Sequence, residues 1–317
     1  MFKLIVLGIL SGAFFSTTFV LNELMSVQGG HWLYSATLRY FFMILFLAII
    51  LLFQGGIKRL IDVYKLFLEH YIFWIISGTI GFGFFYALIC FAADFSPAWV
   101  IAASWQFTIV ATLFVLLFFG KSFSKKIWFF SLLIFIGVCL VNLSHIDNFD
   151  FSIFIYGAIP VLLASFCYPL GNQLIWESQN QTSSNKKSSK VPHIKSSLLK
   201  NSFNKVMLLC LGSIPFWFIL LLIIQPQLPS SSQVINSSLV ALFSGVFATT
   251  IFLYARGLAK DSNEIAAVDA TQASEVIFAI IGGFLLFGTI SINTLSFLGL
   301  TLIILGLFLF IKYQNKS

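Results

Sequence analysis

The chain has 317 residues, of which 59% are hydrophobic and only 9% are charged, and its formal net charge is +7. Soluble domains carry about 25% charged residues, and no soluble core could enclose this much apolar surface. The composition therefore excludes a soluble enzyme or a nucleic-acid-binding domain. It indicates a polytopic membrane protein, whose basic residues report on its orientation in the bilayer.

Ten stretches of the sequence are long and apolar enough to cross a bilayer, which takes about 20 residues. We therefore predict an all-α integral membrane fold with ten transmembrane helices. The first stretch starts at Lys3 like a signal peptide, but it has no small-residue cleavage site and is expected to remain as a span. The predicted spans are 4–25, 32–53, 71–93, 97–119, 127–144, 151–176, 205–225, 238–259, 264–288 and 293–312.

Lys and Arg fall on one side of this ten-span arrangement. Apart from Arg39, the basic residues lie at three kinds of place. They lie before the first span, in or next to a connection that leads from an even-numbered to an odd-numbered span, or near the C-terminus. Neither Lys nor Arg occurs in the opposite connections, which are 26–31, 94–97, 145–151, 226–237 and 289–293. Because basic loops stay in the cytoplasm, the pattern predicts a multi-pass protein of the cytoplasmic membrane with both termini in the cytoplasm.

Residues 177–204 form a polar segment rich in Ser, Asn and Lys. This composition cannot bury a core, so it predicts a flexible cytoplasmic linker. A regulatory role for its lysines, or contact with lipid head groups, is the alternative.

The two halves of the chain repeat each other. Phe84–Ala102 aligns with Phe252–Ala270 at a constant offset of 168 residues. We predict two five-helix repeats, 1–150 and 151–317, with the linker inside the second. Since each repeat has an odd number of spans, the second enters the membrane from the opposite side, an inverted repeat that many secondary transporters use.

Several motifs resemble those of the drug/metabolite transporter superfamily, whose ten-span members consist of two EamA-like repeats. The motifs are SGAFFSTTFVLNEL from Ser11, LRYFF around Arg39, the pairs Tyr86-Ala87 and Tyr254-Ala255, and the closing LGLTLIILGLFLF from Leu298. Within the superfamily the chain is most similar to the multidrug resistance efflux transporters. The resemblance covers nearly the whole chain and implies efflux of drug-like compounds.

The sequence also departs from that family. Family members often have Pro in the middle of spans four and nine, where this chain has Gln106 and Glu275. They often have Glu after the glycine that closes these spans, where this chain has Lys121 and Thr289. The small four-span relatives carry an essential Glu at mid-depth in span one, whereas Glu23 lies near the outer end, so that role is not carried over.

Glu275 is the strongest candidate for chemistry. It lies about eleven residues into span nine, near the bilayer centre, where an acid costs about 2.5–3.5 kcal/mol even on lenient scales. Gln272 shares its helix face with small residues, which mark a close approach to neighbouring helices or a cavity. We predict that Glu275 faces the interior and exchanges a proton for a cationic substrate. The alternative is a structural acid bonded to another helix.

Three further charged residues lie within or near the spans. Asp269 sits near the cytoplasmic end of span nine, at an inner mouth or in a favourable place for the helix dipole. Glu23 and Arg39 lie at comparable depths near the outer ends of spans one and two. They are expected to form an ion pair, either an outer gate or a static link.

Polar and aromatic side chains form two further groups of candidates for a transport cavity. For the polar ones, hydrogen bonding between helices is the alternative; for the aromatic ones, it is core packing. The candidates are Ser11, Thr18, Asn22, Tyr86, Trp105, Thr108 and Thr112.

Motifs for cofactors, metals and enzyme nucleophiles are absent from the sequence. The four cysteines show no CxxC or Cys/His spacing, so no metal is expected. We predict a secondary active transporter that exports small organic compounds, cationic ones included, by proton-coupled alternating access. Its expected partners are substrate, protons and lipid, and it is expected to be a monomer or homodimer. The alternatives are an uncoupled amino-acid or metabolite permease, and a membrane scaffold or membrane-embedded enzyme.

Overall fold

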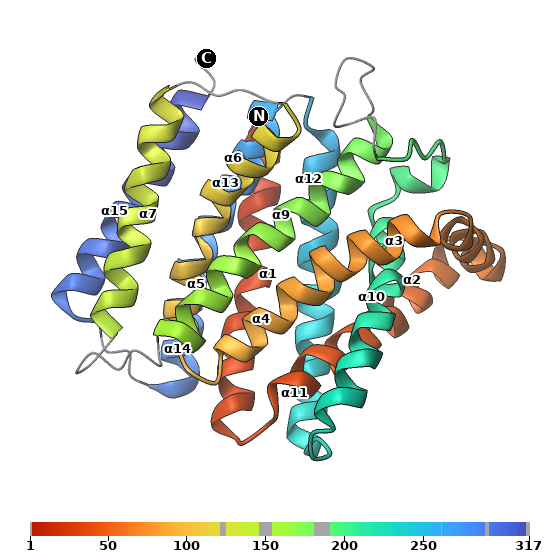
Figure 1. Cartoon of the computed structure of the whole chain (residues 1–317), viewed down its shortest axis with the longest axis horizontal. Helices are drawn as coiled ribbons and strands as arrows, with labels where there is room; N and C mark the ends of the chain where they lie inside the picture. Colours follow the sequence, from red (N-terminus) through yellow and green to blue (C-terminus); the bar gives the residue numbers. More distant parts are fainter. Residues whose placement is uncertain are drawn as a thin grey trace.

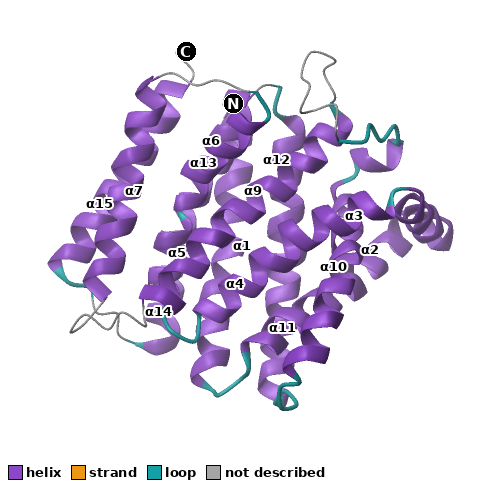
Figure 2. Ribbon diagram, in the orientation of Figure 1, coloured by secondary structure: helices purple, strands orange, loops and turns teal. Residues whose placement is uncertain are grey.

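The computed structural model describes residues 2–120, 125–145, 154–180, 191–260, 262–288 and 292–314, and the regular structure in these ranges is helical. The helices lie side by side in one bundle, with both chain ends on the same side of it (Figure 1, Figure 2). In chain order the elements are α1 Phe2–Val27, α2 Trp32–Glu69, α3 Tyr71–Gly78, η1 Thr79–Phe84, α4 Phe85–Ala92, α5 Ala98–Trp105, α6 Phe107–Phe118, α7 Lys125–His145, η3 Phe154–Ala158, α9 Ile159–Gln179, η5 Ser197–Lys200, α10 Ser202–Ile224, α11 Ser231–Val240, η6 Ala241–Ala248, α12 Thr249–Leu258, α13 Ser262–Ala270, η7 Thr271–Ala273, α14 Ser274–Phe287 and α15 Thr294–Gln314.

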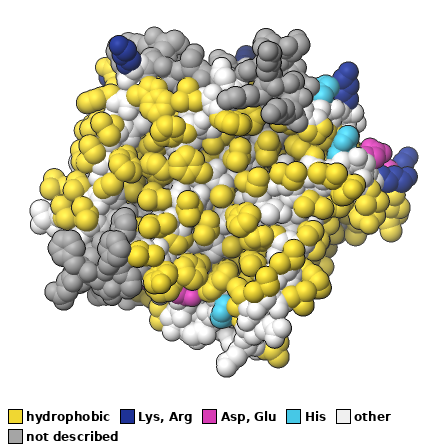
Figure 3. Space-filling view, viewed as in Figure 1, with side chains coloured by type: hydrophobic (Ala, Val, Ile, Leu, Met, Phe, Trp, Pro, Cys, Tyr) yellow, Lys and Arg dark blue, Asp and Glu magenta, His cyan; other side chains and the backbone are white. Residues whose placement is uncertain are grey.

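Within these ranges, nine helical stretches are long and apolar enough to cross a membrane. They correspond to predicted spans one to nine, and a shorter apolar helix, Thr294–Phe310, falls in the tenth. A bilayer favours helices because it offers backbone N–H and C=O groups no water to bond. On the face seen in Figure 3, apolar side chains predominate among the described residues, and basic ones lie along the upper and right edges. The predicted all-helical membrane fold is confirmed for this part of the chain.

Helix α2 continues beyond its predicted span, which ended at residue 53. Gly55 and Gly56 leave helical geometry, and Gly56 has φ 64 and ψ −169, a conformation that glycine adopts without steric cost. The chain turns there and continues as a second helical arm, residues 57–69, seen nearly end-on at the right of Figure 1. We call this arm the elbow helix. From the sequence, these residues were expected to connect two spans, and no helix was predicted for them.

The second part of the predicted flexible linker is folded against the bundle. Val191, Ile194 and Leu199 are buried, with exposed fractions of 6%, 3% and 2%. Asn201 donates from Nδ2 to Gln54 Oε1 at 3.0 Å, which ties the segment to the end of the first arm of α2. Spaced apolar side chains anchor a chain whose average composition is polar. Residues 191–204 are thus packed against the bundle, residues 177–179 belong to α9, and 181–190 lie outside the described residues.

Glycines mark the places where helices cross in direct backbone contact. A Cβ on Gly212 of α10 would lie 2.0 Å from the Trp74 backbone oxygen of α3. At one edge of the bundle α7 and α15 lie side by side (Figure 1), and a Cβ on Gly137 would lie 2.6 Å from the Gly299 oxygen. Small residues of this kind let membrane helices approach closely.

We expect Gly212→Ala to lower the free energy of unfolding by about 1–3 kcal/mol, the usual cost of overpacking. The added methyl group meets a backbone oxygen, which cannot rotate away as a side chain can. Thermal unfolding of the purified protein in detergent measures the loss. Gly257→Ala is the control, because a Cβ there meets Lys205 Nζ at 3.4 Å, an ordinary contact. Equal stability of the two variants would contradict the direct crossing of α3 and α10.

The helices are irregular at similar places in the two halves of the chain. Spans three and eight contain the π-helical segments η1 and η6, and spans four and nine are interrupted, at Gln106 and at η7. The two interrupted spans end on glycines in the left-handed region, Gly120 with φ 82 and Gly288 with φ 77. Irregular backbone at membrane depth is tolerated inside the protein or beside a cavity. We therefore expect these interruptions to lie in the interior of the bundle.

Candidate functional site

The two interrupted spans contribute to a small cavity inside the bundle, which we call the central cavity. Its volume is about 10 Å³, roughly the room that one water molecule needs. An organic molecule does not fit, so binding one requires the helices to move apart. The lining residues are Phe15, Thr18, Phe19, Arg39, Phe85, Trp105, Tyr168, Ser244, Gln272 and Glu275.

Glu275 lies in the first turn of α14 with 1% of its surface exposed. Its Oε1 is buried without a hydrogen-bond partner. The side chain packs close to α1, since a Cβ on Gly12 would lie 3.5 Å from Glu275 Cγ. The positive end of the α14 dipole contributes about 0.3–1 kcal/mol, whereas burying an ion costs several kcal/mol. An ionised Glu275 therefore needs a further compensating charge.

Gln272 presents a second unpaired polar group to the central cavity. It lies in η7 with 2% exposure, and its Nε2 has no hydrogen-bond partner. Its backbone oxygen accepts a hydrogen bond from Gln106 Nε2 at 3.4 Å. Because Gln106 lies at the interruption of span four, the two interruptions are in direct contact. Gln272 and Glu275 thus offer an amide donor and a carboxylate acceptor side by side.

Arg39 brings a buried positive charge to the same cavity. Its guanidinium carbon lies 3.9 Å from the centre of the Tyr86 ring. It donates to Thr18 Oγ1 at 3.3 Å and to Ser244 Oγ at 3.1 Å, while its Nε has no partner. A cation stacked on an aromatic face and bonded to hydroxyls is held in place without a carboxylate.

The ion pair predicted between Glu23 and Arg39 is not formed. Glu23 Oε2 instead accepts a hydrogen bond from the Ala98 backbone N–H at 2.8 Å. Ala98 is the first residue of α5, and the preceding Pro97 offers no side-chain cap. The Glu23 carboxylate therefore caps α5 at the positive end of its dipole. The two residues have similar depths in the sequence, but they contact different neighbours.

Two of the predicted cavity-lining residues do line the central cavity. Thr18 donates to Ser244 Oγ at 2.6 Å. Trp105 packs against Phe85 and Tyr168, with ring centres 5.0 and 5.7 Å apart. Together they connect spans one, three, four, six and eight around the cavity.

The remaining predicted candidates make contacts between helices outside that lining. This matches the alternative that the sequence analysis gave for polar side chains. Ser11 donates to the Ala248 oxygen at 2.9 Å, Asn22 donates to the Tyr86 hydroxyl at 3.1 Å, Thr108 donates to the Ser165 oxygen at 3.3 Å, and Thr112 lies beside Asp269.

Asp269 forms a buried ion pair with Arg256 of α12, instead of lining an inner mouth as predicted. Arg256 also donates to Gln173 Oε1 at 3.1 Å, and Gln173 donates to Glu177 Oε1 at 3.0 Å. The exposed fractions of the four side chains are between 1% and 3%. Helices α9, α12 and α13 are therefore joined by one polar network. Arg256 had been read from sequence as a marker of orientation, and its pairing was missed.

Several residues of the central cavity were not predicted from the sequence. Phe15 and Phe85 carried no signal in a chain that is 17% aromatic. Ser244 was detectable in principle, since Ser244-Gly245 is a small, partly polar pair in the middle of an apolar span. Tyr168 is a buried phenol on span six, and it gave no more signal in sequence than any other membrane tyrosine.

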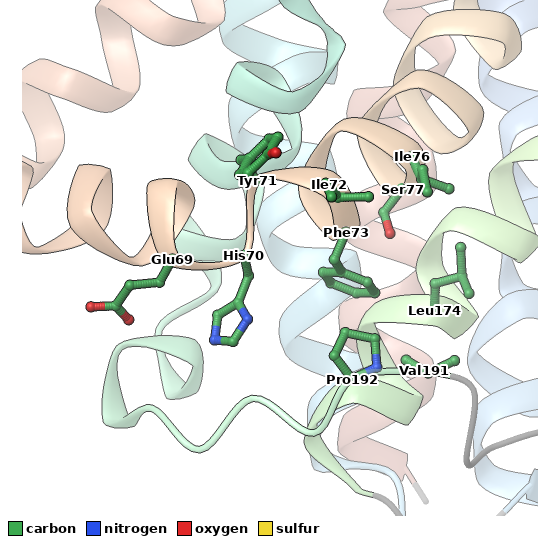
Figure 4. Close-up of a pocket in the computed structure, with 10 residues that line it drawn as sticks. All are labelled: Glu69, His70, Tyr71, Ile72, Phe73, Ile76, Ser77, Leu174, Val191 and Pro192. Atoms are coloured by element: carbon green, nitrogen blue, oxygen red, sulfur yellow. The ribbon is translucent and has the colours of Figure 1, made fainter.

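A larger cavity, of about 430 Å³, lies away from the central cavity at the elbow helix. Figure 4 shows Glu69 and His70 at the end of α2, with Phe73 and Pro192 facing each other across the opening. None of the predicted site residues lines it. Its lining is mainly apolar, and the central cavity with its buried Glu275 remains the candidate site.

Comparison with known proteins identifies the family. Residues 2–316 match the EmrE family, described as "Putative multidrug resistance efflux transporter". The chain belongs to this family. The match confirms the resemblance to the drug/metabolite transporter superfamily that the sequence motifs indicated. The EmrE-family protein is thus a multi-pass membrane protein with a transport function of the efflux type.

Two relatives and one solved structure match over most of this chain. The protein is 36% identical to "Uncharacterized protein YjlA" of Bacillus subtilis (strain 168), covering 97% of this chain and 94% of the relative. It is 33% identical to "Uncharacterized 42.1 kDa protein in intracellular alkaline protease 3'region" of Shouchella clausii, covering 86% and 70%. One crystal structure of a protein matches with a TM-score of 0.62 at 12% identity, covering 97% and 98% of the two chains, which shows a shared fold.

Proposed function

We propose that this EmrE-family protein exports small organic cations across the cytoplasmic membrane in exchange for protons. The observation that carries the proposal is Glu275, a 1% exposed acid with an unpartnered oxygen, in the lining of the central cavity. A buried carboxylate needs a compensating positive charge. A proton or the charged group of a substrate provides it, and the two therefore compete for one site.

Arg39 influences the competition between a proton and the substrate for Glu275. It lines the same cavity as Glu275, and the two form no ion pair in this closed arrangement. A fixed cation near the carboxylate favours release of the proton when the cavity opens to water. Gln272, with its free amide donor, orients the carboxylate or a polar group of the substrate.

We further propose that two five-helix repeats, 1–150 and 151–317, alternate the access to the central cavity. The matching π-helical segments and interruptions of the two halves support this division. So do the crossings, because span three meets span seven at Gly212 and span eight meets span two at Gly245, which faces Met43. Rocking of one repeat against the other around a fixed site is the usual mechanism of inverted-repeat transporters.

The orientation that fits this mechanism places both termini in the cytoplasm. The two chain ends lie on the same side of the bundle (Figure 1). The elbow helix carries Lys58, Arg59 and Lys65, and basic segments remain on the cytoplasmic side.

Flux into proteoliposomes tests the function. Vesicles with an acidic lumen are diluted into alkaline buffer that contains a fluorescent lipophilic cation, ethidium, with the membrane potential clamped by valinomycin and potassium. We expect ethidium to accumulate as protons leave, and we expect no accumulation without the pH gradient or in vesicles without protein. Uptake at the same rate with and without the pH gradient would favour an uncoupled permease. If none of a panel of organic cations were taken up, export of this substrate class would be rejected.

A further inference from the structure

A second, polar cavity lies at the end of the bundle, between α9, α10 and α12. Its volume is about 80 Å³, enough for a group of a few heavy atoms but not for a drug-sized molecule. It shares no lining residue with the central cavity. We call it the terminal cavity, and its lining residues are Asn172, Ile175, Trp176, Gln179, Asn180, Lys205, Leu253, Arg256 and Gly257.

Lys205 is a buried cation in the lining of the terminal cavity, and its burial needs an explanation. Its side chain is 5% exposed, and its ammonium forms no ion pair with the residues that the structure describes. It also lies in the first turns of α10, which begins at Ser202. The positive end of a helix dipole repels a cation. Burial, the missing partner and the dipole all disfavour an ammonium group in this place, unless an anion joins it.

The charged side chains near Lys205 do not neutralise its ammonium group. Arg256 lines the same cavity, and its positive charge is already matched by the ion pair with Asp269. Glu177 accepts a hydrogen bond from Gln173 and is not paired with Lys205. Of the two cations that line the cavity, Lys205 is therefore the one without an ion-pair partner among the described residues.

The remaining polar groups of the wall include two further donors. The two hydrogen bonds of Arg256 use Nη1 and Nη2, which leaves its Nε–H. Asn172 is 3% exposed, and its Nδ2 has no hydrogen-bond partner. A set of ammonium, guanidinium and amide donors is the arrangement that binds the oxygens of a carboxylate or phosphate.

We propose that the terminal cavity is a binding site for a small anionic oxygen group, a carboxylate or phosphate, held chiefly by Lys205 with Asn172 and Arg256 as further donors. The group comes either from a soluble anion or from the head group of an anionic lipid. Because the residues of the central cavity are not involved, the site exists independently of cation export.

Thermal unfolding of the full-length protein measures binding at this site, since a ligand of the folded state raises its unfolding temperature. The probes are sodium phosphate against sodium chloride at equal ionic strength in a neutral detergent, and nanodiscs of phosphatidylcholine with or without phosphatidylglycerol. We expect a saturable stabilisation by phosphate or by phosphatidylglycerol. In Lys205→Gln the apparent affinity should fall about tenfold or more, as expected for the loss of a charge-assisted hydrogen bond.

Two more variants make the result specific. Lys200→Gln removes the same charge from an exposed position of the same segment and should respond like the wild type. Asn172→Asp keeps the size of the side chain and supplies a carboxylate to the wall, so it should abolish the response even if Lys205→Gln fails to fold. A phosphate response identifies a soluble anion, and a response to phosphatidylglycerol alone identifies a lipid. Equal responses of wild type, Lys205→Gln and Asn172→Asp, or no response to either probe, would overturn the proposal.

Discussion

Glu275→Gln should reduce ethidium uptake driven by the pH gradient by about 10- to 100-fold, the effect of losing one charged partner. The amide keeps the shape of the side chain but neither releases a proton nor balances a cation. Its effect on stability should be small, because the Oε1 of Glu275 has no hydrogen bond to lose. Flux in proteoliposomes, measured beside thermal unfolding of the same preparation, separates the two effects.

Glu69→Gln is the matched control for this experiment. It makes the same chemical change at an exposed position of the elbow helix, far from the central cavity lining, and should leave the flux unchanged. Full gradient-driven flux in Glu275→Gln would remove Glu275 from the coupling mechanism. A lower unfolding temperature with normal flux would assign it a structural role, as in a membrane scaffold.

The depth of a residue along a span could be predicted from the sequence, but the neighbour that its side chain contacts could not. Glu275 was found because an acid near the centre of an apolar stretch is costly wherever it points. Glu23 and Arg39 were expected to pair because their depths agree, yet Glu23 caps α5 and Arg39 bonds to Thr18 and Ser244. Small differences in helix rotation decide such pairings, and one sequence does not contain them.

Local composition was informative for the spans and misleading for the connections. A bilayer requires helices of a set length, so hydropathy alone located the spans. Residues 191–204 are polar on average and the elbow helix carries five charged residues, but both pack through a few spaced apolar side chains such as Ile194 and Val63. Packing of this kind depends on the surface that the rest of the fold provides, and average composition cannot reveal it.

The same limit applies to Asp269, which had two predicted roles and has a third. Both an inner mouth and the helix dipole suited an acid near the cytoplasmic end of span nine. The structure instead pairs it with Arg256, thirteen residues earlier in the chain. The connection between the two spans brings these residues together, and neither span alone indicates the pair.

Asp269→Asn should therefore destabilise the protein strongly, by about 3–5 kcal/mol in the free energy of unfolding, because it leaves Arg256 buried without its counter-charge. Arg256→Met should lower the free energy of unfolding by a similar amount, because it leaves the Asp269 carboxylate buried without its counter-charge. The double variant should lose less than the sum of the two, since removing both charges removes the uncompensated ion. A double-mutant cycle from denaturant unfolding in detergent gives the coupling energy.

Asp62→Asn on the elbow helix controls for the loss of an acidic charge, because Asp62 takes part in no ion pair of the described residues. It should change the free energy of unfolding by less than about 0.5 kcal/mol. Additive losses in the double variant would contradict a direct interaction between Asp269 and Arg256. A coupled result would show that the network joining α9, α12 and α13 stabilises one arrangement of the second half of the chain, through residues that also border the terminal cavity. Anion binding there should then partly restore the stability of Asp269→Asn, because the anion supplies the negative charge that the substitution removes.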